Sequence, residues 1–172
     1  CLYQWAGKQH SKVRDMLPKI IRYWGAIGGV CDGTGIGEPL AYHLKELFDR
    51  NNDGLVEAYK FKAAGDESKS KLGYLAYDFN HNDLIKVPKA PEDPDQLELW
   101  KELRWQVEHL TREAKRQQTI NFYVPANAEP RKPGHVPHDD LVMALFLLMR
   151  AARNIDPNTG KATAFDREKS GV

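Results

Sequence analysis

The sequence is poor in cysteine, in long hydrophobic runs and in net charge, and each shortage excludes a class of protein. Its two cysteines, Cys1 and Cys31, are too few for a disulfide framework and lack the paired spacing of a zinc site. The longest apolar run, Leu141 to Met149, is far shorter than the roughly 20 residues of a transmembrane helix. No secretory signal opens the chain. We therefore expect a cytoplasmic protein with no membrane partner.

The charge is nearly balanced, which excludes a protein that coats nucleic acid through its overall field. The 172 residues include 25 Lys and Arg against 24 Asp and Glu, for a formal net charge of +1. Any nucleic-acid contact must come from a local basic patch. With 41% hydrophobic residues, the chain has enough apolar material for a buried core.

The apolar patterns predict an α/β fold, in one domain over 1–153 with a polar tail over 154–172. Helices are expected where apolar residues recur at helical spacing, at 11–24, 40–48, 68–79, 99–110 and from 138 onward. Strands are expected at 2–6, 26–32, 55–61 and 120–124. Pro18 predicts a kink or an early boundary in the first helix, which Gly25 should close. The segments 85–94 and 125–137 are rich in proline and should be extended or irregular.

The segment 26–61 reads as strand, glycine turn, helix, turn and strand. The glycine turn is 33–37, and the second turn is 51–54. This order predicts a βαβ unit with parallel strands.

Asp32 is the first candidate for chemistry, because it ends a predicted strand. Ligands of α/β proteins bind beyond the carboxyl ends of strands. The glycines that follow would let a substrate or backbone approach closely. The alternative is that Asp32 caps the following turn or helix, and the spacing does not decide between the two functions.

Asp139 and Asp140 are the second candidate, directly before the apolar run 141–149. A helix formed by this run would be apolar on every face, which predicts a helix buried on all sides with both carboxylates at its N-terminus. The alternative is ordinary capping, because acids are favoured in the first turn of a helix.

Carboxylates from a strand end and from a distant helix would together suit Mg²⁺ or Mn²⁺, if they converge. Two such ions can activate a water and stabilise the leaving oxygen of a phosphodiester. His138 is a further candidate ligand or base, with a capping or surface role as the alternative.

Basic and hydroxylated residues open the helix expected at 68–79. The candidates for binding DNA phosphates, through backbone N–H groups and ammonium charge, are Ser68, Lys69 and Ser70. A solvated helix cap is the alternative.

Three familiar motifs are absent. The segment 49–54 begins like an EF-hand loop, but Lys60 stands where the bidentate Glu is required. Glu38 occupies the third glycine position of a dinucleotide fingerprint. The phosphate loop of the P-loop ATPases is also missing.

In their order, four motifs resemble the nuclease domain of phage large terminase subunits. They are Val30 to Gly37, Lys60–Phe61, Ser68 to Ser70, and His138 to Leu145. The resemblance spans nearly the whole chain and implies an RNase H-like (retroviral integrase) fold, with a mixed sheet flanked by helices. It implies a Mg²⁺- or Mn²⁺-dependent endonuclease that cuts concatemeric viral DNA in the host cytoplasm during packaging.

The resemblance also assigns roles. Asp32 matches the second acidic position of the family, Asp139 or Asp140 the third, and Lys69 a basic position that we expect to contact DNA. Double-stranded DNA, a terminase small subunit and a portal are the implied partners. The family's first catalytic Asp lies on an opening strand, whereas no Asp precedes Asp15 here. We therefore expect an N-terminally truncated nuclease domain, without the ATPase of the full subunit.

Two other functions fit the same acidic pattern. One is an RNase H-type nuclease outside packaging, such as a junction resolvase. The other is a non-catalytic prophage remnant that acts as a binding module, which the missing first acid and the near-neutral charge favour.

Overall fold

A computed structural model describes residues 10–48, 56–61, 69–86, 89–115, 119–153 and 155. The predicted strand at 2–6, the turn at 51–54, Ser68 and nearly all of the predicted tail lie outside these residues. The chain divides into two compact units, a division that the sequence pattern did not indicate. The last helix, α5 (Asp140–Arg153), contributes its first half to one unit and its second half to the other.

One unit contains the predicted βαβ segment. Its elements are α1 (His10–Tyr23), β1 (Gly29–Asp32), the 3₁₀ turn η1 (Gly35–Gly37), α2 (Glu38–Phe48), β2 (Val56–Tyr59) and the second half of α5. Strands β1 and β2 pair in parallel, with Gly29 opposite Val56 and Asp32 opposite Tyr59. The predicted strand–helix–strand order with parallel strands is therefore confirmed, although β1 is shorter than the expected 26–32.

Helix α1 runs through Pro18 without ending there. The Pro18 ring is buried, so its packing offsets the hydrogen bond that a proline cannot donate. The helix closes at Gly25, as predicted, where a φ of +56° suits glycine.

The core of this unit lies between α2 and β2. Ala41 and Tyr59 are fully buried, and Leu44 and Val56 nearly so. The second half of α5 is joined to β2 by an ion pair, in which Arg150 contacts both carboxylate oxygens of Glu57 at 3.3 Å.

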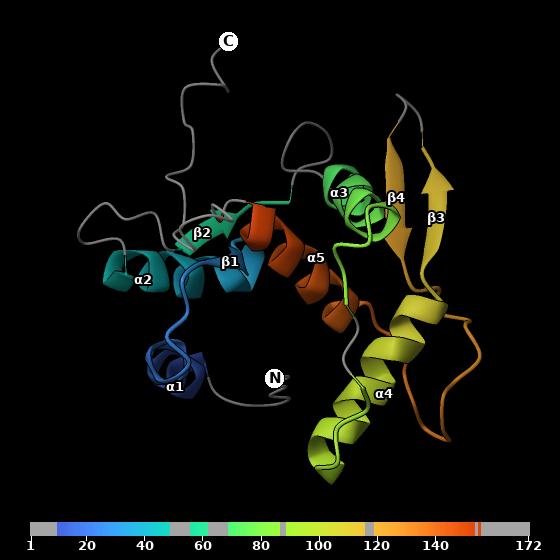
Figure 1. Cartoon of the computed structure of the whole chain (residues 1–172), viewed down its shortest axis with the longest axis horizontal. Helices are drawn as coiled ribbons and strands as arrows, with labels where there is room; N and C mark the ends of the chain where they lie inside the picture. Colours follow the sequence, from blue (N-terminus) through green and yellow to red (C-terminus); the bar gives the residue numbers. More distant parts are fainter. Residues whose placement is uncertain are drawn as a thin grey trace. The chain divides into compact units, whose positions relative to one another are not determined.

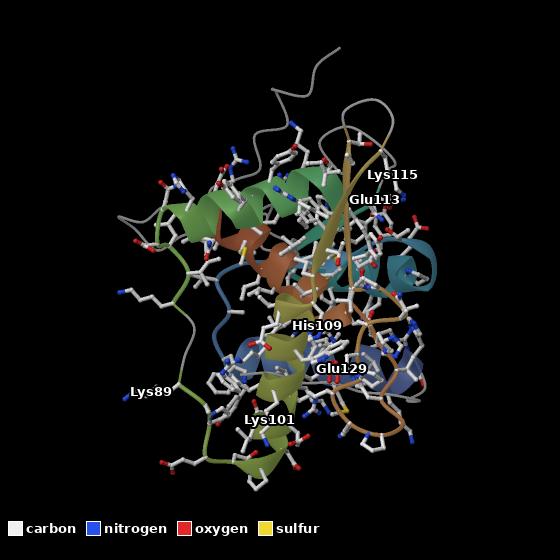
Figure 2. The ribbon with its side chains drawn as sticks, turned by 90° about the vertical axis from the view of Figure 1, so that its right-hand side faces the viewer. Lys89, Lys101, His109, Glu113, Lys115 and Glu129 are labelled. Carbon is white, nitrogen blue, oxygen red and sulfur yellow. The ribbon has the colours of Figure 1, made fainter. Side chains whose placement is uncertain are left out.

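The other unit packs helices beside an antiparallel hairpin. Its elements are α3 (Lys69–His81), α4 (Pro94–Glu108), β3 (Thr111–Ala114), β4 (Ile120–Tyr123) and the first half of α5. Helix α3 lies alongside β4 (Figure 1). Figure 2 shows His109 at the end of α4, from which the chain enters β3, with Glu113 on that strand and Lys115 directly after it.

The described strands form two separate two-stranded sheets, one parallel and one antiparallel, where a single mixed sheet was expected. In the second sheet, Thr111 pairs with Tyr123 and Ala114 with Ile120. The sequence did not predict β3, because its four residues are mostly polar and mostly exposed. The fold is α/β in class.

Helix α4 begins at Pro94, where the sequence predicted a loop. The Asp93 carboxylate accepts a hydrogen bond from the Gln96 backbone N–H at 2.9 Å and so caps the helix. Proline is well suited to the first helical position because its missing N–H would have no partner there.

Helix α5 is not buried all round, which corrects the expectation from its apolar sequence. Val142 and Phe146 are buried, but Ala144, Leu148 and Ala152 form an exposed stripe, and Leu148 is 63% exposed. A spacing of four residues places these three side chains on one face of the helix. In the described part of the chain, no helix has the length and apolar character needed to cross a bilayer.

Candidate functional site

Asp32 is exposed at the carboxyl end of β1. Its Oδ1 accepts a hydrogen bond from the Thr34 backbone N–H at 2.8 Å, which forms an Asx turn directly after the strand. The Gly33 N–H continues the pairing of the sheet by donating to the Tyr59 carbonyl oxygen at 2.8 Å. Asp32 therefore does stabilise the turn, as the alternative prediction had it, and it does so while remaining open to solvent.

The glycine turn folds back against the Asp32 backbone. A Cβ added at Gly37 would lie 2.6 Å from the Asp32 carbonyl oxygen, closer than real Cβ atoms approach. Across the turn, the Phe61 backbone N–H donates to Thr34 Oγ1 at 3.0 Å. These contacts explain the need for glycine at this position and fix the backbone from which the Asp32 carboxylate projects.

The thiol of Cys31, the neighbour of Asp32, has low reactivity. Burial, and then the negative charge of Asp32, raise the pKa of the Cys31 thiol to about 11. A protonated thiol is a poor nucleophile and a poor metal ligand. Of these two neighbours, Asp32 and not Cys31 is therefore the candidate metal ligand.

At the start of α5, the two acids do not cap the helix. The backbone N–H groups of Leu141 and Val142 would normally be capped by the residue that precedes the helix. Both instead donate to Oε1 of Gln106 in α4, at 2.9 and 3.1 Å. The capping role that was the alternative explanation for Asp139 and Asp140 thus belongs to a side chain 35 positions earlier, and no sequence spacing points to it.

The Asp139 carboxylate instead lies beside Lys69 at the start of α3. Lys69 Nζ donates to Asp139 Oδ2 at 3.2 Å, and both side chains are partly exposed. The structure therefore brings together two predicted site residues that are 70 positions apart. Asp140, the first residue of α5, and His138 are both exposed.

Ser70, for which a DNA contact was predicted, bonds to the neighbouring hairpin through its side chain. Ser70 is buried, with 9% of its surface exposed, and its hydroxyl oxygen accepts a hydrogen bond from the Ile120 backbone N–H at 3.1 Å. The side chain ties α3 to β4 because the first turn of α3 packs against the hairpin.

A second polar group, which the sequence analysis missed, surrounds Gln106. Its centre is Glu102, whose carboxylate accepts hydrogen bonds from Gln106 Nε2 at 3.0 Å and Arg131 Nε at 3.3 Å, and lies 3.0 Å from His135 Nε2. Glu102, Gln106, Arg131 and His135 line a hollow of about 410 Å³ that His138 also lines. The basic pair at 131–132 was visible in the sequence, but its partners on α4 were not.

Carboxylates suit Mg²⁺ and Mn²⁺ in kind, because both ions prefer oxygen ligands. In number, neither unit brings enough of these ligands together among its described residues. Asp32 belongs to one unit, and Asp139 and Asp140 belong to the other. Among the described residues, no three His, Cys, Asp or Glu side chains gather closely enough to hold a metal ion. The donors therefore agree with the implied ions in chemistry but not in number, and the Lys69 ammonium compensates the Asp139 carboxylate.

Compared with known proteins, the chain matches no family model, no curated protein and no solved structure.

Proposed function

We propose that the chain is the metal-dependent endonuclease part of a phage terminase large subunit with an RNase H-like fold, which cuts concatemeric viral DNA during packaging. The observation that carries the proposal is that the acids at the start of α5 do not cap their own helix. Their helix is capped by Gln106, and Asp139 lies beside a lysine. Neither carboxylate is needed to cap its own helix, so in this proposal both can turn to a metal ion.

In this proposal the acids come from segments more than a hundred positions apart in the sequence. Asp32, Asp139 and Asp140 would hold Mg²⁺ or Mn²⁺, with His138 as a further ligand or base. The bound ions would supply an activated water and stabilise the leaving oxygen of the phosphodiester. The Asx turn keeps the Asp32 carboxylate at the carboxyl end of β1, where α/β proteins bind their ligands.

Lys69 supports the proposal because its ammonium group can neutralise a carboxylate before DNA binds and a phosphate once DNA is bound. Without DNA or metal, its charge compensates Asp139 at 3.2 Å. With duplex DNA bound, the same flexible side chain would turn to a phosphate oxygen, the commonest kind of protein–DNA contact. In this proposal Lys69 and the predicted backbone donor of Ser68 then form the DNA contact. A terminase small subunit and a portal are the further partners of this proposal.

A plasmid-nicking assay in Mn²⁺ tests the proposal. We expect the chain to nick supercoiled plasmid, and Asp32→Asn and Asp140→Asn to reduce the rate by at least about 100-fold, because each removes a ligand from a metal-assisted reaction. Asp78→Asn is the control, since Asp78 is an exposed acid on α3 outside the site. Equal nicking by all four proteins would refute the assignment of these carboxylates.

The substrate separates the alternatives. Preferred cleavage of four-way junctions or RNA–DNA hybrids over linear duplex would indicate a nuclease outside packaging. Binding of DNA with no cleavage in either metal would indicate a binding module.

A further inference from the structure

The hollow of about 410 Å³ beside α4 is lined by charged side chains of both signs. Glu98 and Glu102 come from one face of α4, and Arg131 and Lys132 come from the segment that leads into α5. All its lining residues belong to the same compact unit. We propose that this hollow binds the phosphate group of a phosphomonoester, a nucleotide or the 5′ end of a nucleic-acid strand, through Arg131 and Lys132. The proposal involves no metal ion and does not rest on the proposed function.

Glu98 is surrounded by more positive charge than its own carboxylate can balance. The carboxylate contacts three cations, namely Arg131 Nη2 at 3.0 Å, Lys101 Nζ at 3.1 Å and Lys132 Nζ at 3.6 Å. Hydrogen bonds from Arg131, and then from Lys101, lower the pKa of Glu98 to about 2, so the group is charged at neutral pH. With Glu102 included, two carboxylates face three cations. The surplus charge is positive and favours an anionic ligand.

Glu102 has no capacity left for a cationic ligand. Its Oε1 accepts a hydrogen bond from Gln106 Nε2 and lies 3.0 Å from His135 Nε2, and its Oε2 accepts from Arg131 Nε. The side chain of Glu102 is only 13% exposed, so these partners surround it. Both carboxylates therefore hold Arg131 in place, and neither attracts a further cation.

Arg131 and Lys132 have donors left for a ligand. The Arg131 side chain is 18% exposed, and its Nε and Nη2 are fixed by Glu102 and Glu98. Its Nη1 has no partner among the described residues and is not a buried atom. Lys132 Nζ is too far from Glu98 for a good hydrogen bond, and both side chains are half exposed or more, so this pair opens at little cost. A fixed guanidinium and a mobile ammonium are typical ligands of a phosphate group.

The hollow has room for more than a phosphate ion. Its volume lies in the range of small-molecule sites, roughly 300–1,000 Å³, and Leu99 and Val136 give it apolar surface on which an organic group can pack. His135 also lines it, and the Nδ1 atom of this largely buried ring has no hydrogen-bond partner among the described residues. Buried atoms of this kind are uncommon, and a ligand or a water usually accounts for them.

Calorimetric titration of the full chain with dTMP tests the proposal. Thymidine is the matched ligand, because it lacks only the phosphate, and EDTA is present so that no divalent ion takes part. We expect thymidine to bind at least about tenfold more weakly than dTMP, since it loses the charge-assisted hydrogen bonds. The NMR amide signals of Gly134 and His135 should shift with dTMP, which locates the ligand in the hollow.

Two lysine variants form a matched pair. Lys132 and Lys101 both contact Glu98, but only Lys132 lines the hollow. We expect Lys132→Gln to weaken dTMP binding about tenfold and Lys101→Gln by less than about twofold. Arg131→Lys keeps the charge and removes the planar fork, and it should also weaken binding about tenfold. If Arg131→Lys does not fold, the two lysine variants decide, because both side chains are exposed.

An oligonucleotide with and without a 5′ phosphate separates the two sources of the ligand. Both outcomes support the proposal: tighter binding of the phosphorylated oligonucleotide than of dTMP identifies a strand end, and weaker binding identifies a free nucleotide. Equal affinity for dTMP and thymidine overturns the proposal, as does an equal loss of affinity in Lys132→Gln and Lys101→Gln. Sulfate that binds as tightly as dTMP also overturns it, because the hollow then holds an adventitious ion only.

Discussion

Replacing Gly37 by alanine should distort the turn that carries Asp32. The new Cβ would lie 2.6 Å from the Asp32 carbonyl oxygen, and contacts under 3.0 Å are essentially never seen for real Cβ atoms, so the backbone must shift by several tenths of an ångström. Overpacking of this kind costs about 1–3 kcal/mol. Because the obstacle is a backbone atom, no side chain can move aside to relieve it.

Gly33→Ala is the matched control, four residues earlier in the same turn. There the added Cβ would lie 3.4 Å from the Ala58 Cβ and the Tyr59 carbonyl oxygen, at the tight end of ordinary contact. Reduced freedom of the unfolded chain stabilises a compatible Gly→Ala change by about 0.4–1 kcal/mol. We therefore expect the two variants to differ by about 1.5–4 kcal/mol in local stability, with Gly37→Ala the less stable.

Amide exchange of Thr34, measured by NMR, is the suitable assay. The Thr34 N–H donates to Asp32 Oδ1, so its protection reports the Asx turn directly. A residue-level measurement is needed because a chain with two compact units need not unfold in one step. Equal Thr34 protection in the two alanine variants would refute the reasoning.

Two further predictions concern ion pairs. Arg150→Met should cost about 1–3 kcal/mol in urea unfolding, because it leaves the largely buried Glu57 carboxylate without its cation. Arg153→Met, on the exposed end of the same helix, should change stability by less than about 0.5 kcal/mol; equal effects would contradict this assignment. A hydrogen bond from Arg131 lowers the pKa of Glu98 from 4.5 to about 2. A lowered folded-state pKa gives stability that is present above pH 4.5 and lost as the pH falls toward 2. In urea titrations the Glu98→Gln variant should therefore lose less stability over that pH range than the wild type. An identical loss would argue against the Glu98–Arg131 ion pair.

The sequence predicted those elements whose pattern depends on local chemistry. The βαβ segment followed from two short apolar runs separated by glycines and an amphipathic helix, and the parallel pair β1–β2 confirmed it. The end of α1 followed from Gly25. Strand β3 was missed because its residues are mostly polar and exposed, and a strand of this kind is held by its partner and not by its own pattern.

The candidate site shows the same limit. Asp32, Lys69, Asp139 and Asp140 could be chosen from the sequence because their residue types and neighbours suggest chemistry. Gln106 could not, because a lone glutamine on an amphipathic helix carries no signal until its partner helix is in place. The exposed stripe of α5 could not be predicted either, since an apolar sequence does not show how many faces of the resulting helix other elements cover.

The proposed function requires Asp32 and the acids of α5 to bind the same divalent ions, and Mn²⁺ itself can report whether they do. Paramagnetic Mn²⁺ broadens the NMR signals of nearby amides, so Gly33 and Thr34 on one side and Asp140 and Leu141 on the other can be followed in one titration. The account predicts that both sets broaden over the same range of Mn²⁺ concentration, and that Asp32→Asn weakens the broadening at α5 as well as at its own turn. Broadening of one set alone, or an α5 response that is indifferent to Asp32→Asn, would contradict it.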